Sequence, residues 1–284
     1  MKKKFSNRKK EPQQVKADKA KAKAKAKSKA KQKQAANVSK KKEPAPIKRD
    51  LPKKEKNVLY LISSDSKNIG NNIQSSIDTW LKNIGKGCDY LFLCDKTIEE
   101  KNCISCPDIN YNNHNSYSSK NMKWFLTREL WRLPIEYEYI CFCTDTTYLD
   151  TAKIFIDDFL LSHWGCVTNL FYPSMEELKR INPSIDTNEV RMYHAEAGFV
   201  ISKDIIRKIA YRLDHTNNIL SDRWDSMIGY MLYLLKIELN HDELFFSFPH
   251  SMLNLSDEDV KKSKSHGYLK DYEKAEIHRI LTGR

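Results

Sequence analysis

Long hydrophobic runs are missing from this 284-residue sequence, and no stretch approaches the roughly 20 apolar residues that a membrane-spanning helix needs. The basic N-terminus is not followed by the apolar segment of a secretory signal peptide either. We therefore expect the chain, as it stands, to be cytoplasmic. An N-terminus longer than the given one would change this expectation to the secretory pathway.

The cysteine pattern lacks the features of a zinc or disulfide framework. Of the seven cysteines, Cys103 and Cys106 have CxxC spacing, and the second pair that would complete a four-cysteine zinc site is missing. Cys141 and Cys143 share one face of a predicted strand, so we expect them to be buried thiols. Without a secretion signal, reduced cysteines are the default.

Acidic and aromatic residues are scarce in the first 56 positions, where Phe5 is the one aromatic side chain. This segment holds 23 Lys/Arg and 5 Asp/Glu, against 26 and 32 in the remaining residues, so the formal net charge of +12 arises from the N-terminus. Charge repulsion and low hydrophobicity predict a disordered basic tail over residues 1–56. Its charge suits a membrane surface or nucleic acid of negative charge. The alternative is a solvated extension without a partner.

Residues 57–284 are sufficient for one sizeable core. Apolar strand patterns lie at 58–64, 90–95, 137–143, 197–202 and 245–248, and helical patterns at 72–83, 124–133, 154–161, 203–213 and 225–237. Strands that alternate with helices predict an α/β fold, here an α/β/α sandwich with a mostly parallel central sheet. Trp80, Trp124 and Trp131 lie at helical spacing with other apolar residues, so we expect them in the core.

Polar side chains end three of the predicted strands: Ser63, Asp95 and Asp145. Because ligands of open α/β sheets bind at the carboxyl ends of the strands, these are candidate binding residues. Asp145 follows an apolar strand, where an unpaired carboxylate is costly to bury. We expect its partner to be a metal ion with a phosphorylated ligand.

Seven short motifs occur in a fixed order along residues 57–255. They are Tyr60-Leu61-Ile62-Ser63-Ser64, Ile77-Asp78-Thr79-Trp80, Leu91-Phe92-Leu93-Cys94-Asp95, Thr144-Asp145-Thr146-Thr147-Tyr148-Leu149, Ala197-Gly198-Phe199-Val200-Ile201-Ser202, Asp225-Ser226-Met227-Ile228-Gly229-Tyr230 and Phe245-Phe246-Ser247-Phe248-Pro249-His250. This order resembles glycosyltransferase family 31, in its fringe-like and core-1 galactosyltransferase-like branch. The resemblance implies a GT-A fold for a domain over residues 57–255, followed by a polar C-terminal segment over 256–284.

The resemblance also implies an activity, namely transfer of a hexose from a UDP-sugar to a hydroxyl of a glycan or glycoprotein with inversion. Such enzymes use a divalent metal, typically manganese. The family's run of aspartates falls on Thr144-Asp145-Thr146, so one aspartate is retained. By this resemblance Asp145 and His250 are the predicted metal ligands.

The base that takes the acceptor's proton falls on Asp225 by the same resemblance. The alternative is that Asp225 only caps the following helix. Glu196 brings a charge where the family has no side chain, and either reshapes the donor or acceptor site or points to solvent.

Four further residues are predicted to bind the donor. Ser63 would contact the nucleotide, and Asp95 would either contact the nucleotide or cap the next turn. Gly198 would let the backbone approach the ligand closely. Lys123, or Lys120, would neutralise a donor phosphate, with a solvated lysine as the alternative.

The loss of aspartates leaves a second hypothesis open. A pseudo-enzyme of the same fold would bind a carbohydrate or a protein partner without turnover. The sequence does not fix the donor sugar, the linkage or the oligomeric state.

Overall fold

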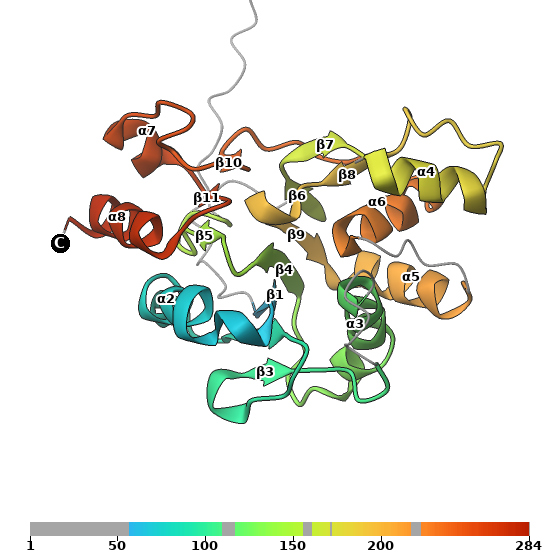
Figure 1. The fold of residues 1–284 in the computed structure, drawn as a ribbon, viewed down its shortest axis with the longest axis horizontal. Coiled ribbons are helices and arrows are strands. Elements are labelled where there is room, and N and C mark those ends of the chain that lie inside the picture. Colours follow the sequence, from blue (N-terminus) through green and yellow to red (C-terminus); the bar gives the residue numbers. More distant parts are fainter. Residues whose placement is uncertain (1–56, 110–116, 156–160, 171, 217–222, 284) are drawn as a thin grey trace, which may run out of the picture. The chain divides into compact units, whose positions relative to one another are not determined.

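A six-stranded sheet forms the centre of the folded unit (Figure 1). The computed structural model describes residues 57–109, 117–155, 161–170, 172–216 and 223–283. The strands are β1 Val58–Ser63, β2 Cys88–Leu93, β3 Cys103–Ile104, β4 Tyr139–Thr144, β5 Tyr148–Leu149, β6 His163–Gly165, β7 Val167–Asn169, β8 Arg191–Tyr193, β9 Phe199–Ser202, β10 Phe245–Phe246 and β11 Ser265–His266. The α-helices are α2 Gln74–Asp78, α3 Tyr117–Thr127, α4 Tyr172–Ile181, α5 Lys203–Asp214, α6 Trp224–Leu234, α7 Asp257–Lys262 and α8 Asp271–Thr282.

The central sheet has the strand order β3-β2-β1-β4-β9-β6 and is mostly parallel, as predicted. β1 runs parallel to both β2 and β4, and β2 runs parallel to β3. β9 is antiparallel to its neighbours β4 and β6. The carboxyl ends of β1, β2 and β4 therefore meet at one edge of the sheet, where the predicted strand-end side chains lie.

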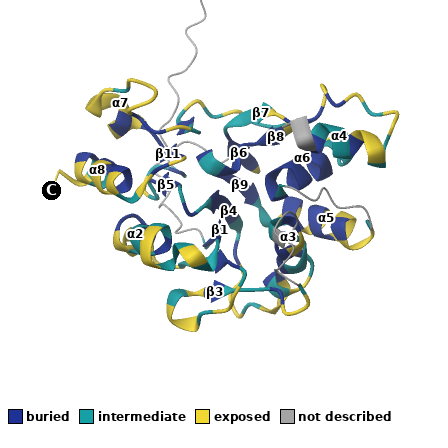
Figure 2. Cartoon of the chain, viewed as in Figure 1, coloured by how far each residue is buried: buried dark blue, intermediate teal, exposed yellow. Residues whose placement is uncertain are grey.

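Helices cover both faces of the sheet, which gives the predicted α/β/α sandwich (Figure 1). Successive side chains of β1 point to opposite faces, so Leu59 and Leu61 join the core under α3, α5 and α6. Val58, Tyr60 and Ile62 join the core under α2 and α8. Figure 2 shows the central strands buried and the outer sides of the helices exposed.

The helix predicted over 72–83 is three short segments in the structure. A π-helix, η2 (Ile69–Ile73), leads into α2, and a 3₁₀ helix, η3 (Leu81–Asn83), follows. The break lies at Thr79, whose backbone leaves the helical region and whose hydroxyl donates to the carbonyl of Ser75 at 2.6 Å. The apolar positions of the pattern remain buried, because Ile73, Trp80 and Leu81 all belong to the core.

Two other predicted elements differ from the structure. The strand predicted at 245–248 is only the two-residue β10. Within the helix predicted at 154–161, residues 154 and 155 form a turn, and residues 156–160 lie outside the described part.

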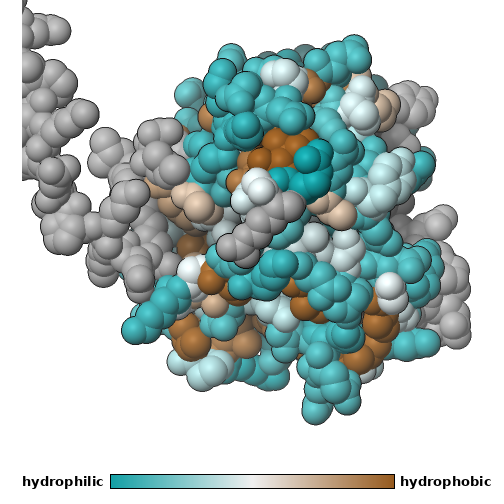
Figure 3. Space-filling model, turned by 90° about the vertical axis from the view of Figure 1, so that its left-hand side faces the viewer, coloured by the Kyte–Doolittle hydropathy of each residue, from teal (hydrophilic) through white to brown (hydrophobic). Residues whose placement is uncertain are grey.

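The C-terminal segment 256–284 contributes α7, β11 and α8. Val260, Ile277 and Ile280 belong to the same hydrophobic cluster as Val58 and Tyr60. The packing is therefore continuous across residue 255, where the sequence analysis placed a boundary. Figure 3 shows the face carrying α2, α7 and α8 as mostly hydrophilic, with hydrophobic residues in small patches. Within the described residues, no helix has the length and apolar character needed to cross a membrane.

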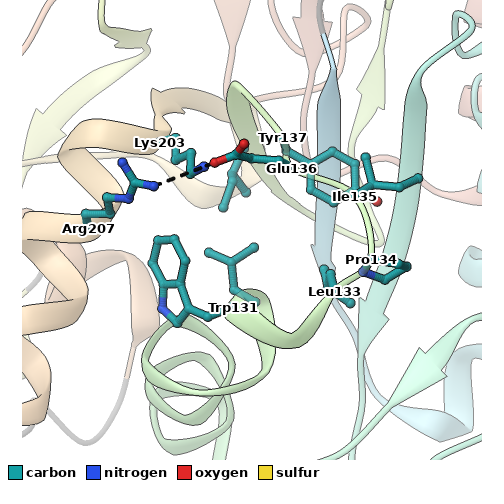
Figure 4. A pocket seen from close by; sticks show the side chains of 10 residues that line it. Trp131, Leu133, Pro134, Ile135, Glu136, Tyr137, Lys203 and Arg207 are labelled. Carbon is teal, nitrogen blue, oxygen red and sulfur yellow. Dashed lines mark ion pairs between the residues drawn. The ribbon is translucent and has the colours of Figure 1, made fainter.

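Trp131, expected in the core, is 40% exposed and borders a groove of about 250 Å³ at the amino end of β4 (Figure 4). Glu136 crosses this groove to pair with Lys203 and, at 3.6 Å, with Arg207. The groove lies at the opposite edge of the sheet from the carboxyl ends of the parallel strands.

Candidate active site

The turn Thr144–Thr147 at the carboxyl end of β4 sends its side chains in two directions. The turn is closed by the amide of Thr147, which donates to the carbonyl of Thr144 at 3.1 Å. The side chain of Asp145 is directed to residues that follow β1, whereas Thr144 and Thr146 are directed to Glu196. This alternation divides the strand-end residues into two groups on opposite sides of the turn.

On the first side, Asp145 is held by polar residues of the segment after β1. Its Oδ2 atom accepts hydrogen bonds from Ser64 Oγ at 2.5 Å and Asn68 Nδ2 at 2.8 Å. Burial raises the pKa of Asp145 above its ordinary value, and these two hydrogen bonds partly offset that effect. The Oδ2 atom of Asp145 is thus satisfied by two protein donors.

Lys274 of α8, in the C-terminal segment, contacts the backbone of Asp145. Its ammonium group donates to the carbonyl oxygens of Asp145 and, at 3.0 Å, Asn72, and to Ser76 Oγ at 3.1 Å. The side chain is fully buried, and burial lowers the pKa of Lys274 to about 8. Lys274 therefore ties α8 to the end of β4.

Ser63 and Asp95 lie at the neighbouring strand ends, as predicted. The carbonyl of Ser63 accepts from the amide of Asp145 at 3.1 Å. Asp95 accepts from the amide of Ser66 at 2.6 Å and from its hydroxyl at 2.9 Å. Together with Asp145, these residues line the carboxyl ends of β1, β2 and β4. Their predicted role in nucleotide binding stays a prediction.

On the second side, Glu196 occupies the space in front of the two threonines. Its Oε2 atom accepts hydrogen bonds from Thr144 and, at 2.7 Å, from Thr146. Its backbone carbonyl accepts from Thr147 Oγ1 at 2.9 Å. Burial raises the pKa of Glu196, and the hydrogen bonds from the threonines oppose that rise. A carboxylate from the segment before β9 thus meets Thr144 and Thr146, the positions where the resemblance implies aspartates.

Asp225 lies beside this group, in the first turn of α6, and Arg223 is the N-cap residue. Arg223 binds the carboxylate of Asp225 with two hydrogen bonds, Nε to Oδ1 at 3.0 Å and Nη2 to Oδ2 at 2.7 Å. The amides of Ser226 and Ala195 add hydrogen bonds at 2.8 and 3.3 Å. The Asp225 side chain is only 1% exposed, whereas the Arg223 side chain is 31% exposed. Asp225 is therefore covered, and Arg223 is the cation that faces outward.

His250 is not in contact with either aspartate among the described residues. Its Nε2 atom lies 3.7 Å from Glu276 of α8, and its ring centroid lies 6.2 Å from that of His266. The Asp145 side chain is directed to Ser64 and Asn68. In the described part of the chain, no three His, Cys, Asp or Glu residues are grouped so that they could hold a metal ion. The residues present do not fit the predicted metal site.

Lys123 and Gly198 were also predicted to bind the donor substrate, and in the structure each makes contacts within the fold. Lys123 of α3 donates from Nζ to the carbonyl of Thr216 at 2.9 Å, after the end of α5, and burial lowers its pKa. Gly198 has φ +77°, and a Cβ there would lie 3.1 Å from Leu149 Cδ2 and 3.4 Å from the carbonyl oxygen of Phe142. The freedom of this glycine serves the close packing of β4 and β5. Ligand contacts of both residues remain predictions.

Sequence reasoning did not identify Arg223 or Lys274, and it left Glu196 undecided. A signal for Glu196 was present in the sequence. The motif Thr144-Asp145-Thr146 lacks acids that the resemblance implies, and Glu196 adds an acid next to the Ala197-Gly198 motif. Arg223 is two residues from Asp225, a spacing that allows a pair across the start of a helix. Lys274 gave no local signal, because its contacts are with residues more than 120 positions away.

A second cavity of about 640 Å³ also lies away from the strand-end residues. It is bordered by the end of α6, the residues that follow it, and β7. Neither this cavity nor the groove at Trp131 contains a carboxylate of the two strand-end groups.

Comparisons with known proteins identify the family of this chain. No curated protein matches the sequence. Among solved structures, the apo structure of the bifunctional glycosyltransferase WbbM is similar, with a TM-score of 0.46 and 12% identity. The similarity covers 80% of this chain, which spans about half (50%) of the length of that one. The family model described as Fringe-like matches residues 66–282. That match covers most of the chain, so the chain belongs to the Fringe-like family of glycosyltransferases.

Proposed function

We propose that this protein transfers a hexose from a UDP-sugar to a hydroxyl of a glycan or glycoprotein acceptor, at the carboxyl end of β4. The observation that carries the proposal is the meeting of Glu196, Arg223 and Asp225 at this edge of the sheet in a Fringe-like chain. Ser63, Asp95 and Asp145, on the other side of the turn, are the proposed contacts of the nucleotide.

The reaction needs a group that accepts one proton. The acceptor oxygen bonds to C1 of the sugar, the bond from C1 to the diphosphate oxygen breaks, and UDP leaves with that electron pair. Because attack comes from the opposite face, the configuration at C1 inverts. The proton of the acceptor hydroxyl must pass to a base as the new bond forms.

Glu196 suits this role better than Asp225, the residue implied by the family resemblance. Both oxygens of Asp225 accept hydrogen bonds, and Arg223 covers the carboxylate. Glu196 is partly exposed, and only its Oε2 atom is held by the threonines. Its Oε1 atom makes no hydrogen bond to the described residues, which leaves that atom able to accept a proton, and burial raises the pKa of the Glu196 carboxyl. We therefore assign proton removal to Glu196.

Arg223 supplies positive charge for the departing UDP. Two of its N–H groups hold Asp225, which fixes the guanidinium, and 31% of the side chain is exposed. A fixed cation next to a leaving diphosphate lowers the energy of the transition state. The manganese implied by the family has no matching set of ligands among the described residues, so no step is assigned to it.

The test is UDP release from a panel of UDP-hexoses, with Glu196→Gln compared with the parent. We expect Glu196→Gln to lower turnover about 10²- to 10⁴-fold, the usual effect of losing a general base. Glu243→Gln, at an exposed site, is the matched control and should keep the parent's turnover. No turnover with any donor, or equal turnover in Glu196→Gln and parent, would refute the proposal.

A second candidate is a binding module without turnover, favoured by the threonines in place of two aspartates. Calorimetry distinguishes the two candidates. Binding of UDP together with a complete absence of UDP release would support the module.

A further inference from the structure

Two aromatic side chains are stacked on each other at the surface beside the candidate active site. The ring centroids of Phe248 and Tyr268 lie 5.7 Å apart with an interplanar angle of 22°. Phe248 is 43% and Tyr268 41% exposed. Aromatic side chains usually bury their faces, so an exposed stacked pair indicates a surface that receives a ligand.

Tyr268 is held in a backbone conformation that bulky residues rarely adopt. Its φ is +53°, in the left-handed region that favours glycine and asparagine. The ring of His194 packs edge-on against it, with centroids 5.8 Å apart and an interplanar angle of 74°. Such backbone strain is concentrated at functional sites, where the surrounding structure stabilises it.

The segment that carries Tyr268 runs along Glu196 and Thr146. A Cβ at Gly267 would lie 2.3 Å from the carbonyl oxygen of Glu196, so only glycine allows this approach. On the other side of Tyr268, the amide of Leu269 donates to the carbonyl of Thr146 at 2.9 Å. The aromatic pair is therefore fixed next to the proposed base.

Polar groups lie along the edge of the aromatic pair. Burial raises the pKa of Tyr268, the charge of the nearby Glu196 raises it further, and the nearby Arg223 opposes this rise. A pyranose ring has one face of C–H groups, which packs on an aromatic ring, and a rim of hydroxyls, which needs donors and acceptors. The exposed rings together with Glu196 and Arg223 provide both kinds of contact.

We propose that Phe248 and Tyr268 form a platform for a sugar ring of the acceptor, which brings an acceptor hydroxyl to Glu196. This assignment rests on the proposed glycosyl transfer. Beyond that proposal, the platform defines the class of acceptor as a pyranose with an unhindered C–H face, and it names Phe248 and Tyr268 as the residues that bind this face.

The test uses saturation-transfer NMR with methyl glycosides of glucose, galactose, N-acetylglucosamine and N-acetylgalactosamine. The full-length parent should transfer saturation to the ring C–H protons of at least one glycoside. Tyr268→Asn, which keeps the left-handed backbone, and Phe248→Ala should bind that glycoside at least tenfold more weakly. Tyr268→Phe should bind it as the parent does, because the ring is retained.

Controls separate this proposal from the glycosyl-transfer proposal. Tyr211→Ala removes another exposed tyrosine, on α5, and should change nothing. UDP binding, measured by calorimetry, should be equal in Tyr268→Asn and parent. Binding of no glycoside by the parent, equal binding by Tyr268→Asn, or loss of UDP binding in Tyr268→Asn would overturn the platform. Glycoside binding that depends on Tyr268 without any UDP release would uphold the platform and refute glycosyl transfer.

Discussion

Replacement of Lys274 by methionine tests how the C-terminal helix is joined to the strand-end residues. Lys274 is 0% exposed, and its ammonium group donates to Asn72, Ser76 and Asp145. Methionine keeps most of the side-chain volume but leaves these three acceptors without their donor. The change therefore separates the contribution of the hydrogen bonds to the free energy of unfolding from the contribution of side-chain packing.

The expected loss of stability follows from these contacts. Hydrogen bonds to charged groups contribute about 1.5–3 kcal/mol each, and the cost of burying the ammonium offsets part of their sum. We expect Lys274→Met to lower the free energy of unfolding by about 3 kcal/mol. For a folded unit of this size that corresponds to a melting temperature lower by roughly 6–12 °C.

The pH dependence gives a second signature of the same side chain. Burial lowers the pKa of Lys274 to about 8, whereas a lysine in the unfolded chain has a pKa of about 10.4. Between these values the unfolded state binds more protons, so Lys274 adds stability as the pH rises through this window. The stability difference between parent and Lys274→Met should widen by up to about 1.4 kcal/mol per pH unit above pH 8.

The assay is urea unfolding followed by far-UV circular dichroism at pH 7 and pH 9. Arg279→Met, on the exposed side of the same helix, is the matched control and should stay within about 0.5 kcal/mol of the parent. A Lys274→Met variant as stable as this control would refute the reasoning. A difference that narrows between pH 7 and pH 9 would contradict the assigned protonation.

Three further predictions concern other regions. Burial raises the pKa of Glu196, so its contribution to stability is present below pH 4 and is lost as the pH rises through the folded pKa. Glu196→Gln should therefore gain stability relative to the parent in urea unfolding as the pH rises above about 4. Gly267→Ala should destabilise the fold by about 1–3 kcal/mol and displace Glu196, whereas Gly70→Ala, with no atom within 4 Å of the new Cβ, should stay within about 0.5 kcal/mol in thermal unfolding. Deletion of residues 1–56 should abolish salt-dependent binding to anionic vesicles or DNA in a sedimentation assay, and unchanged binding would refute a role for the tail.

The central sheet could be predicted because its strands carry local signals. The apolar runs of β1 and β4 are buried on both faces, which is typical of parallel strands, and β2 is buried at its carboxyl end. The antiparallel direction of β9 was not predictable, since periodicity is the same in both directions. The break at Thr79 also went unpredicted, because it depends on a side-chain hydrogen bond to the backbone within a helical pattern.

The candidate site was only partly predictable. The motifs assigned Asp145, Asp225 and His250 to one site and left Glu196 undecided, and they gave no directions for these side chains. Thr144 and Glu196 are 52 positions apart, and their contact depends on how β9 pairs with β4. The prediction of a metal shared by Asp145 and His250 relied on the order of motifs alone, which carries no information on which way each side chain points.

The central claim is that Glu196 removes the acceptor's proton while Asp225 holds Arg223. The most direct measurement is the steady-state rate of UDP release by Glu196→Gln and Asp225→Asn, side by side, with one UDP-hexose and one acceptor. The account predicts a kcat at least 10²-fold lower in Glu196→Gln, and a smaller loss of kcat in Asp225→Asn, where Arg223 is still present but is held less firmly. A kcat preserved in Glu196→Gln and lost in Asp225→Asn would contradict it.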